Sequence, residues 1–400
     1  MMTAASNHSS ADAQSKASAV GQWLRGRIPF LNPDRSLVRV LMYPAAEQNP
    51  FLVVTRRKLE ELGAKVTMLT AFDAATLARL APTHDVLHLF NIQEYKSAFT
   101  SPEMVKQVRQ LGRRLSALVT AKGLGLRIVW TLYNEPKGDY SSEWLERLGR
   151  QWIFSLADRI ICPSQATSTL LRTRYPGMPD HKLTVIPHHN FGQYFPKQVS
   201  RRQARTHLGI ETQGRVFLCF GGIHPYKGLT DLIPLFGRHP LREHTLIVAG
   251  NPSNVHYAAT IEGLCSQYPN VHAYLRYVPA DDVQYYMHAA DVFVMPFKDV
   301  LNSGSLMLAL SFGKPLVAPA VGSIPEIATS ACSVLYDPAA ANGLKTALAQ
   351  AAEMDIERAA GAARRVADGY SADKLTRRLV NLYLEFFPKR PKLPEEDEEL

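Results

Sequence analysis

The 400-residue sequence predicts an α/β fold made of two successive, doubly wound halves. Short apolar runs alternate with helix-like segments from Leu37 onwards, as in a parallel sheet covered by helices. A polar, basic stretch at 196–214 interrupts this alternation, and the pattern then restarts. The chain is also longer than one hydrophobic core usually serves, so we expect two domains.

The elements follow in order. An amphipathic segment at 49–63, closed by Gly63, is expected to be a helix, and a last helix is expected near 371–387. The expected strands of the first half are 37–44, 65–69, 85–90, 126–134, 159–164 and 183–189, and those of the second are 216–223, 245–252, 271–278, 291–297 and 315–320. The domain boundaries that we predict are 1–34 (flexible tail), 35–198, 199–370, 371–388 (a helix packing back on the first domain) and 389–400 (disordered tail).

Composition limits the classes of function. The net charge of +9 suits phosphorylated substrates, an anionic membrane surface or nucleic acid, but no nucleic-acid-binding motif accompanies it. No apolar run reaches the length of a membrane-spanning helix, and no secretory signal is visible. The four cysteines are scattered and predict buried free thiols. We therefore expect a cytoplasmic protein that binds no nucleic acid.

Two turns of the second half are suited to an anion. The phrase FGGIHPYKG (220–228) predicts a strand, a glycine turn and a lysine that opens a helix. The phrase NSGSLMLALSFGKPLVAP (302–319) predicts a small-residue turn, an apolar helix, a glycine stop and a strand. Turn amides, helix N-termini and a lysine favour negative charge, so we expect a nucleotide diphosphate here. The candidate residues are Gly221, Gly222, Lys227, Asn302, Ser303, Gly304 and Ser305.

Other strand ends supply further candidates. Asn251, Tyr277 and Val278 follow strands of the second half and could line the same nucleotide-diphosphate site, or form plain turns. In the first half, a carboxylate or imidazole would be needed to take a proton from a substrate hydroxyl. Four candidates for this base follow first-half strands: Glu94, Glu135, Asp139 and His188. No metal-binding motif is present, so no metal site is predicted.

The segment 104–122 predicts a long helix with two different faces. Val105, Val108, Leu111, Leu115 and Leu118 recur at helical spacing and are expected to face the core. The other side carries Lys106, Arg109, Arg113 and Arg114, either as a solvated face or as a contact for anionic lipid or a lipid diphosphate.

With these phrases in view, the chain resembles the GT-B glycosyltransferases over nearly its whole folded length, and most of all the inverting β-mannosyltransferases of xanthan-type exopolysaccharide assembly. The similar phrases are DVLHL…EY, TLYN, FGGIHPYKG, VAGNP and NSGSLMLALS…PLVAP, in this order. The resemblance implies two Rossmann-like domains facing across a cleft. It further implies a nucleotide-sugar donor (GDP-mannose in the closest case), no cofactor, and a polyprenyl-diphosphate-linked oligosaccharide acceptor at the inner face of the plasma membrane. By match, Asn49 and Glu94 lie on the acceptor side. Tyr133 and Asn134, which follow a first-half strand, are further acceptor candidates, and Asp299 is a further donor candidate.

The sequence departs from the related families at two points. Retaining GT-B enzymes carry two glutamates eight positions apart, whereas here Leu308 stands at the second and only Asp299 lies near the first. The mannosyltransferases have a histidine where this chain has Tyr133. A retaining transferase that uses a UDP-sugar or GDP-sugar, and a non-catalytic glycan-binding scaffold of the same fold, therefore stay open as alternatives.

Overall fold

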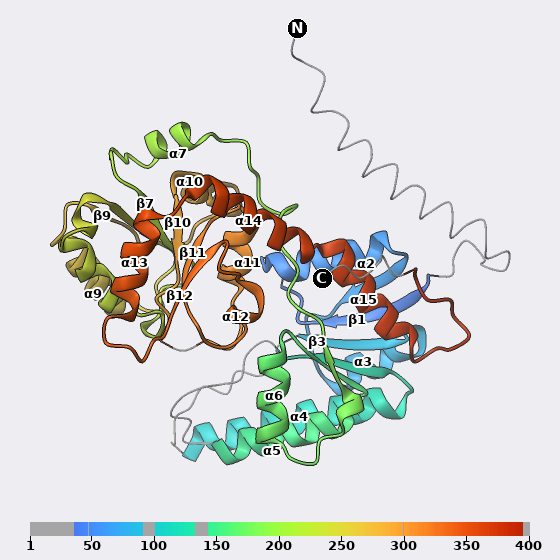
Figure 1. The fold of residues 1–400 in the computed structure, drawn as a ribbon. Coiled ribbons are helices and arrows are strands. Elements are labelled where there is room, and N and C mark those ends of the chain that lie inside the picture. The colour runs from blue at the N-terminus through green and yellow to red at the C-terminus, as the bar shows by residue number, and fades with distance from the viewer. Residues whose placement is uncertain (1–35, 47, 91–100, 133–142, 299, 395–400) are drawn as a thin grey trace, which may run out of the picture. The chain divides into compact units, whose positions relative to one another are not determined.

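The computed structural model describes residues 36–46, 48–90, 101–132, 143–298 and 300–394 (Figure 1). The chain divides into two units, Met1–Leu37 and Val38–Leu400. The second unit contains two parallel sheets of six strands each, which confirms the α/β, doubly wound fold predicted from the sequence.

The first sheet has the strand order β2-β1-β3-β4-β5-β6. All its strands are parallel, but β2 is added on one side of β1 and all later strands on the other. The point between β1 and β3 is therefore the topological switch point of this sheet. In doubly wound folds, such a switch point opens a crevice at the carboxyl ends of the strands. The strands are β1 (Val38–Tyr43), β2 (Ala64–Met68), β3 (Val86–Phe90), β4 (Arg127–Thr131), β5 (Arg159–Cys162) and β6 (Leu183–Val185).

The second sheet has the order β12-β11-β10-β7-β8-β9, with its switch point between β7 and β10. Its strands are β7 (Val216–Phe220), β8 (Thr245–Ala249), β9 (Val271–Tyr274), β10 (Val292–Val294), β11 (Leu316–Pro319) and β12 (Ser333–Tyr336). Alternate residues of β7 enter two different apolar clusters, Leu218 in one and Phe217 in the other. The sheet is therefore buried on both faces, as expected of parallel sheets.

Helices connect the strands. The α-helices are α2 (Pro50–Glu61), α3 (Ala74–Leu80), α4 (Ser101–Gly123), α5 (Glu143–Leu156), α6 (Gln165–Arg174), α7 (Arg201–His207), α8 (Leu229–Leu232), α9 (Val255–Cys265), α10 (Val283–Ala289), α11 (Gly304–Ser311), α12 (Ile324–Ile327), α13 (Gly343–Glu353), α14 (Ile356–Gly369) and α15 (Ala372–Leu384). The 3-10 turns are η1 (Ala81–Thr83), η2 (Asp180–Lys182), η3 (Pro225–Lys227), η4 (Ile233–Gly237), η5 (Leu241–Glu243) and η6 (Ala280–Asp282).

The last helix returns to the first sheet. α15 packs against α2 and β1 (Figure 1), and the Tyr383 hydroxyl lies 2.5 Å from His88 Nδ1 on β3. His88 Nε2 lies 2.7 Å from Thr131 Oγ1 on β4, so both ring nitrogens of this buried histidine have partners. Burial lowers the pKa of His88 to about 3, which keeps its ring neutral.

Most elements expected from the sequence are present, with differences at their ends. The four cysteines are buried free thiols, as predicted, and burial raises the pKa of Cys162 to about 12. The prediction that Lys227 opens a helix is wrong. Lys227 is the last residue of η3, and α8 starts only after Gly228. β12 was not predicted, because its residues SVLY give only a short apolar run.

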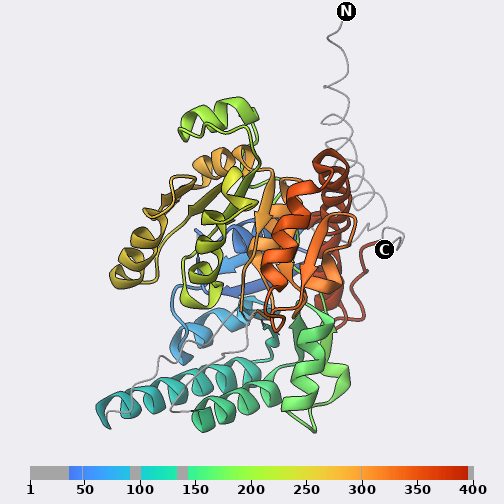
Figure 2. The ribbon, with the colours of Figure 1, turned by 60° about the vertical axis from the view of Figure 1, so that its left-hand side comes forward.

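The helix predicted at 104–122 is present as α4, but part of its predicted core face is exposed. Leu111 and Leu118 are buried, whereas Val105 is 59% exposed and Val108 is 49% exposed. α4 packs against α3 and α5 (Figures 1 and 2), and those contacts cover the later turns of the predicted face without covering the first ones. Among the described residues, no helix is long and apolar enough to span a membrane.

Candidate active site

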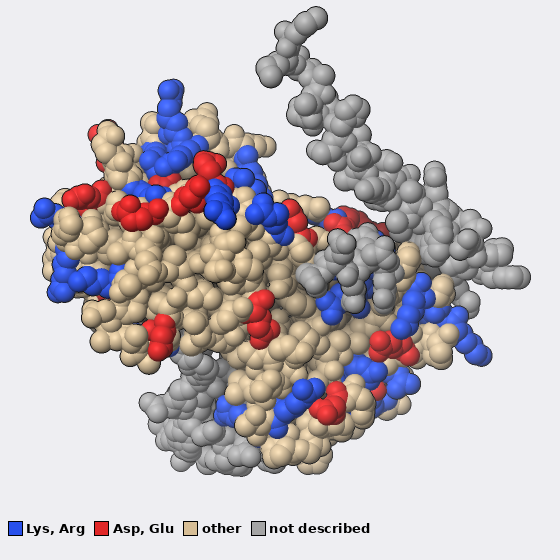
Figure 3. Space-filling view, viewed as in Figure 1, with Lys and Arg blue, Asp and Glu red and all other residues tan. Residues whose placement is uncertain are grey.

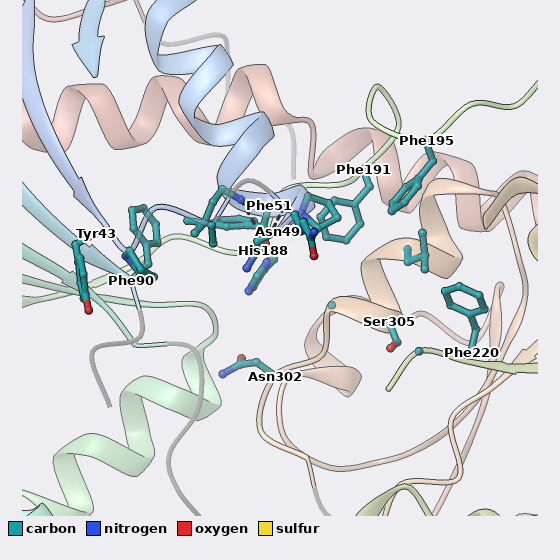
Figure 4. A pocket seen from close by; sticks show the side chains of 18 of the residues that line it. Tyr43, Asn49, Phe51, Phe90, His188, Phe191, Phe195, Phe220, Asn302 and Ser305 are labelled. Carbon is teal, nitrogen blue, oxygen red and sulfur yellow. Dashed lines mark hydrogen bonds between the residues drawn. The ribbon is translucent and has the colours of Figure 1, made fainter. Parts of the chain in front are cut away.

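A cavity of about 920 Å³ lies at the switch points of the two sheets (Figure 4). Four strand ends contribute to its lining: the segment that follows β1, the end of β3, the turn after β7 and the turn after β10. These are the strand ends at which a doubly wound sheet binds its ligand, so one cavity joins the ligand-binding edges of both sheets. The segment after β6 and helix α4 line it as well. The lining residues are Tyr43, Pro44, Ala46, Gln48, Asn49, Pro50, Phe51, Leu52, Phe90, Arg114, His188, Phe191, Phe195, Phe220, Gly221, Asn302, Gly304, Ser305 and Leu308.

On the second-half wall, Gly221 brings a lysine and a serine together. Gly221 has φ 113°, in the region that favours glycine, directly after β7. A Cβ atom at this position would lie 3.1 Å from Lys227 Nζ and 3.3 Å from Ser305 Oγ. The absence of a side chain therefore lets an ammonium group and a hydroxyl group approach the same backbone turn, beside the cavity.

Lys227 is a buried cation. Its residue is 6% exposed, and burial lowers the pKa of its ammonium group. Within the described residues, no carboxylate lies in ion-pair range of it, and its Nζ is 5.1 Å from the centre of the Phe297 ring. A desolvated ammonium group without a counter-ion attracts an anion strongly, because water does not compete for it.

The turn after β10 presents a helix N-terminus to the same place. α11 begins at Gly304, with Ser303 as its N-cap, and the Ser303 side chain makes no capping hydrogen bond. The first amides of a helix have no partner inside the helix and carry partial positive charge. Gly304 and Ser305 line the cavity, so these amides add to the charge of Lys227.

The first-half wall is a packed aromatic layer. Phe51 stacks on His189 with ring centres 4.4 Å apart and planes 10° apart, and its ring centre is also 4.4 Å from that of His188. His189 Nε2 lies 3.0 Å from Thr55 Oγ1 on α2. Asn49 is the N-cap of α2, and its Oδ1 accepts hydrogen bonds from the amides of Phe51 and Leu52. These contacts fix the side chains opposite the turn after β10 (Figure 4). We call residues 301–305 of that turn the donor turn.

Of the two histidines in this wall, His188 is the one that lines the cavity. Burial, together with neighbouring His189, lowers the pKa of His188 to about 3, so its ring is neutral at physiological pH. A neutral imidazole has a nitrogen lone pair and can accept a proton. Arg114 of α4 lines the cavity as well.

The structure brings together only part of the predicted site. Gly221, Asn302, Gly304, Ser305, Asn49 and His188 line the cavity, and Lys227 and Ser303 lie next to these residues. Gly222, Asn251, Tyr277 and Val278 are not among the lining residues: Tyr277 is 59% exposed, and the Asn251 carbonyl accepts a hydrogen bond from the Ile223 amide. The candidates Glu94, Tyr133, Asn134, Glu135, Asp139 and Asp299 lie outside the described residues.

Several lining residues were not predicted. Tyr43 and Phe90 end β1 and β3, so their position at strand ends could have indicated them. Phe191 and Phe195 lie on the segment that leaves the first sheet, and Arg114 lies on α4. No local sequence signal distinguishes Phe191 and Phe195 from core residues, whereas Arg114 belongs to the basic face of 104–122, for which contact with a lipid diphosphate was one of two interpretations. In the described part of the chain, no three His, Cys, Asp or Glu side chains come together as a metal site requires.

Two family models of glycosyltransferases match the chain, one in each half. Residues 51–189 match the model described as "Glycosyltransferase Family 4", and residues 214–354 match the model described as "Glycosyl transferases group 1". The fold is similar to that of Anabaena HepE in complex with UDP, with a TM-score of 0.67, 15% identity and coverage of 87% of this chain and 99% of the other. WaaG, described as a glycosyltransferase of lipopolysaccharide biosynthesis, gives a TM-score of 0.57 with 16% identity and coverage of 86% and 99%.

Two curated enzymes are more similar in sequence. The GDP-mannose:glycolipid 4-beta-D-mannosyltransferase of Xanthomonas campestris is 28% identical over 277 residues, which are 69% of this chain and 71% of that enzyme. The D-inositol 3-phosphate glycosyltransferase of Corynebacterium glutamicum is 25% identical over 304 residues, 73% of this chain and 70% of the other. The two sheets, the cavity between their switch points and both family models define a glycosyltransferase. The chain belongs to the GT-B glycosyltransferases, as its sequence phrases indicated.

Proposed function

We propose that this glycosyltransferase moves mannose from GDP-mannose, with inversion, onto a lipid-diphosphate-linked oligosaccharide. The proposal rests on the buried ammonium group of Lys227, which has no carboxylate in ion-pair range among the described residues and lies beside the Gly221 turn and the N-terminus of α11. This arrangement suits the diphosphate of a nucleotide-sugar. The choice of GDP and mannose is supported by the similarity to the Xanthomonas enzyme.

In this proposal the acceptor and the diphosphate occupy opposite walls of the cavity. The diphosphate binds near Lys227, and the acceptor hydroxyl approaches from the side of Asn49 and His188. The hydroxyl oxygen attacks the anomeric carbon as the bond between that carbon and the diphosphate oxygen breaks. Attack from the wall opposite the leaving group gives inversion. Lys227 and the α11 amides meet the charge that grows on the departing diphosphate.

A side chain of the first half takes the acceptor's proton. Of the four candidate bases, His188 is the one within the described residues, and it lines the cavity as a neutral imidazole. The burial that lowers its pKa also weakens it as a base, but a bound diphosphate adds negative charge to the cavity and favours the protonated imidazole. The other candidates are Glu94, Glu135 and Asp139.

The α4 surface supports a lipid-linked acceptor. Val105, Val108 and Val119 are each about half exposed or more and, at about 100° per residue, lie within about 60° of one another around the helix. Exposed Arg109 lies on the same side, and Trp152 of the adjacent α5 is 53% exposed. Apolar side chains beside basic ones suit the surface of an anionic membrane. On the face drawn in Figure 3, Lys and Arg are interspersed with Asp and Glu.

Calorimetric titration of the purified protein with GDP, UDP and their sugar conjugates tests the donor. Selective binding of GDP and GDP-mannose is expected, and selective binding of UDP would contradict the mannose proposal while keeping the glycosyltransferase. NMR analysis of the product formed with a synthetic lipid-diphosphate oligosaccharide should show a β-mannoside. An α-mannoside would mean retention.

A vesicle experiment tests the membrane contact. The protein should sediment with vesicles containing anionic lipid, and the double variant Val105→Ser/Val108→Ser should bind them at least fivefold less. Val255→Ser is the matched control, because Val255 is 78% exposed on α9 of the second half. Equal binding by both variants would contradict a role for α4.

A further inference from the structure

The N-terminus of α6, in the first half, is capped by a carboxylate from the second half. The Gln165 amide donates to Glu326 Oε2 at 2.8 Å, and the Ala166 amide donates to Glu326 Oε1 at 2.6 Å. α6 has no acidic residue in its own first turn, and the backbone amide that its N-cap Ser164 accepts from is that of Thr167, not those of Gln165 and Ala166. Glu326, on α12, therefore satisfies two amides that a helix leaves without an internal partner.

A second side chain reaches the same helix end from the donor turn. Asn302 Oδ1 accepts hydrogen bonds from Ser164 Oγ at 3.2 Å and Thr167 Oγ1 at 3.3 Å. Asn302 also lines the cavity, two residues before the start of α11. One amide side chain thus touches both the first half and the wall of the candidate active site.

The two second-half contacts belong to one rigid piece of chain. The Ser323 amide donates to the Leu301 carbonyl at 2.9 Å, which ties the α12 loop to the donor turn. Gly322 has φ 58°, and a Cβ atom there would lie 2.3 Å from the Val300 carbonyl oxygen. The close approach of these backbones needs glycine, and it joins the segment that carries Glu326 to the segment that carries Asn302.

We propose that Glu326 and Asn302 form an interdomain clamp on the N-terminus of α6. The clamp fixes the position of the donor turn, and with it the bound diphosphate, relative to the first-half wall that carries His188. This inference rests on the proposed donor site and names the residues that align it with the acceptor. Glu326 is an exposed residue, so a substitution there removes the two hydrogen bonds without leaving a cavity in the core. Both residues are positioning residues.

Hydrogen exchange tests the clamp without any need for activity. In the wild-type protein, the amides of Gln165 and Ala166 should be protected, because helix N-terminal amides without a partner exchange rapidly. Glu326→Ala should speed their exchange at least tenfold, and should also speed exchange in a peptide covering Asn302 to Ser305. Equal exchange at α6 in both proteins would overturn the clamp. Faster exchange at α6 with an unchanged donor turn would overturn the positioning role.

Kinetics separate positioning from simple helix capping. Glu326→Ala should lower kcat at least fivefold while the Kd for GDP stays within twofold, since GDP binds to the second half alone. Adding Ala166→Asp to this variant supplies a carboxylate within the first turn of α6. This double variant should recover thermal stability but not kcat. Recovery of kcat would show that Glu326 acts only as a cap, and would overturn the positioning role.

The failure of this inference can be distinguished from the failure of the proposed function. If the protein binds no GDP and shows no transfer, the proposed function fails, and the exchange experiment still decides the clamp. If transfer occurs and Glu326→Ala changes neither kcat nor exchange, the clamp alone fails. Glu357→Ala is the control, because Glu357 is an exposed acidic residue in the first turn of another helix, α14.

Discussion

Replacement of Lys227 by methionine should weaken GDP binding without lowering the free energy of unfolding of the ligand-free protein. The substitution keeps a long apolar side chain and removes a charge that is 6% exposed and, among the described residues, has no carboxylate in ion-pair range. A hydrogen bond from a charged group to a diphosphate contributes about 1.5–3 kcal/mol. Lys227→Met should therefore weaken GDP binding about 10- to 150-fold. The free energy of unfolding without ligand should stay the same or rise, because an isolated buried charge opposes folding.

The pH dependence of stability gives this prediction a second readout. Burial lowers the folded-state pKa of Lys227 below the ordinary value of 10.5, so the unfolded chain binds this proton more tightly. The destabilisation is complete below the folded-state pKa and disappears as the pH rises toward 10.5. Any stability advantage of Lys227→Met should thus be largest at neutral pH and shrink in alkaline solution.

The assay is calorimetric titration with GDP beside thermal unfolding of the ligand-free protein. Lys298→Met is the matched control: the Lys298 amide donates to the Tyr226 carbonyl at 3.0 Å, so this lysine is close to Lys227 in space. Its side chain is 56% exposed and is paired with Asp231 at 2.9 Å. The control should bind GDP within twofold of the wild type. If Lys227→Met binds GDP as the wild type does, the diphosphate does not bind at the Gly221 turn.

Three further predictions concern the turn and the buried histidines. Gly221→Ala should weaken GDP binding at least tenfold in the same titration. The reason is that φ is 113° at this position and the new methyl group would lie 3.1 Å from Lys227 Nζ. Unchanged affinity for GDP would contradict a role of this turn in binding. Tyr383→Phe should lower the free energy of unfolding in urea by about 1–3 kcal/mol, since buried His88 loses a partner; no change would mean that this hydrogen bond adds nothing. His88 and His188 have pKa values lowered by burial to about 3, so stability should fall as the pH drops from about 6.5 toward 3, by up to about 1.4 kcal/mol per pH unit for each histidine. Thermal unfolding measured across that range checks this, and a flat profile would contradict their burial.

The sequence predicts well what depends on neighbouring residues. A buried parallel strand is a continuous apolar run, so β1, β3, β7 and β8 could be recognised directly, and β12 was missed because its run is short and contains a serine. The glycine turn after β7 and the small-residue turn after β10 could be connected because parallel strands place their carboxyl ends at one edge. The cavity confirms that Gly221 and Ser305 share that edge.

Contacts between distant segments could not be predicted in this way. Helical spacing shows that Val105 and Leu111 lie on one side of α4, but it does not show that the neighbouring elements cover only Leu111. The burial of Lys227 depends on Phe297, which follows β10 seventy residues later. The contact of Glu326 with the N-terminus of α6 joins residues 160 positions apart in the chain. Nothing in the sequence of α6 predicts that a residue so distant caps it.

Leu308 shows why the departure from the retaining pattern matters for the chemistry. It lines the cavity, and no described lining residue is acidic. By the resemblance noted in the sequence, retaining GT-B enzymes carry a glutamate at this position. A carboxylate on this wall would repel the diphosphate and partly neutralise Lys227. With Leu308, Phe191 and Phe195 nearby, the wall is apolar instead, and an apolar wall excludes water and strengthens the attraction between the ammonium group and the leaving diphosphate. A site that has Leu308 in place of the glutamate can therefore still favour departure of the diphosphate. Loss of the glutamate alone is no argument for a non-catalytic scaffold.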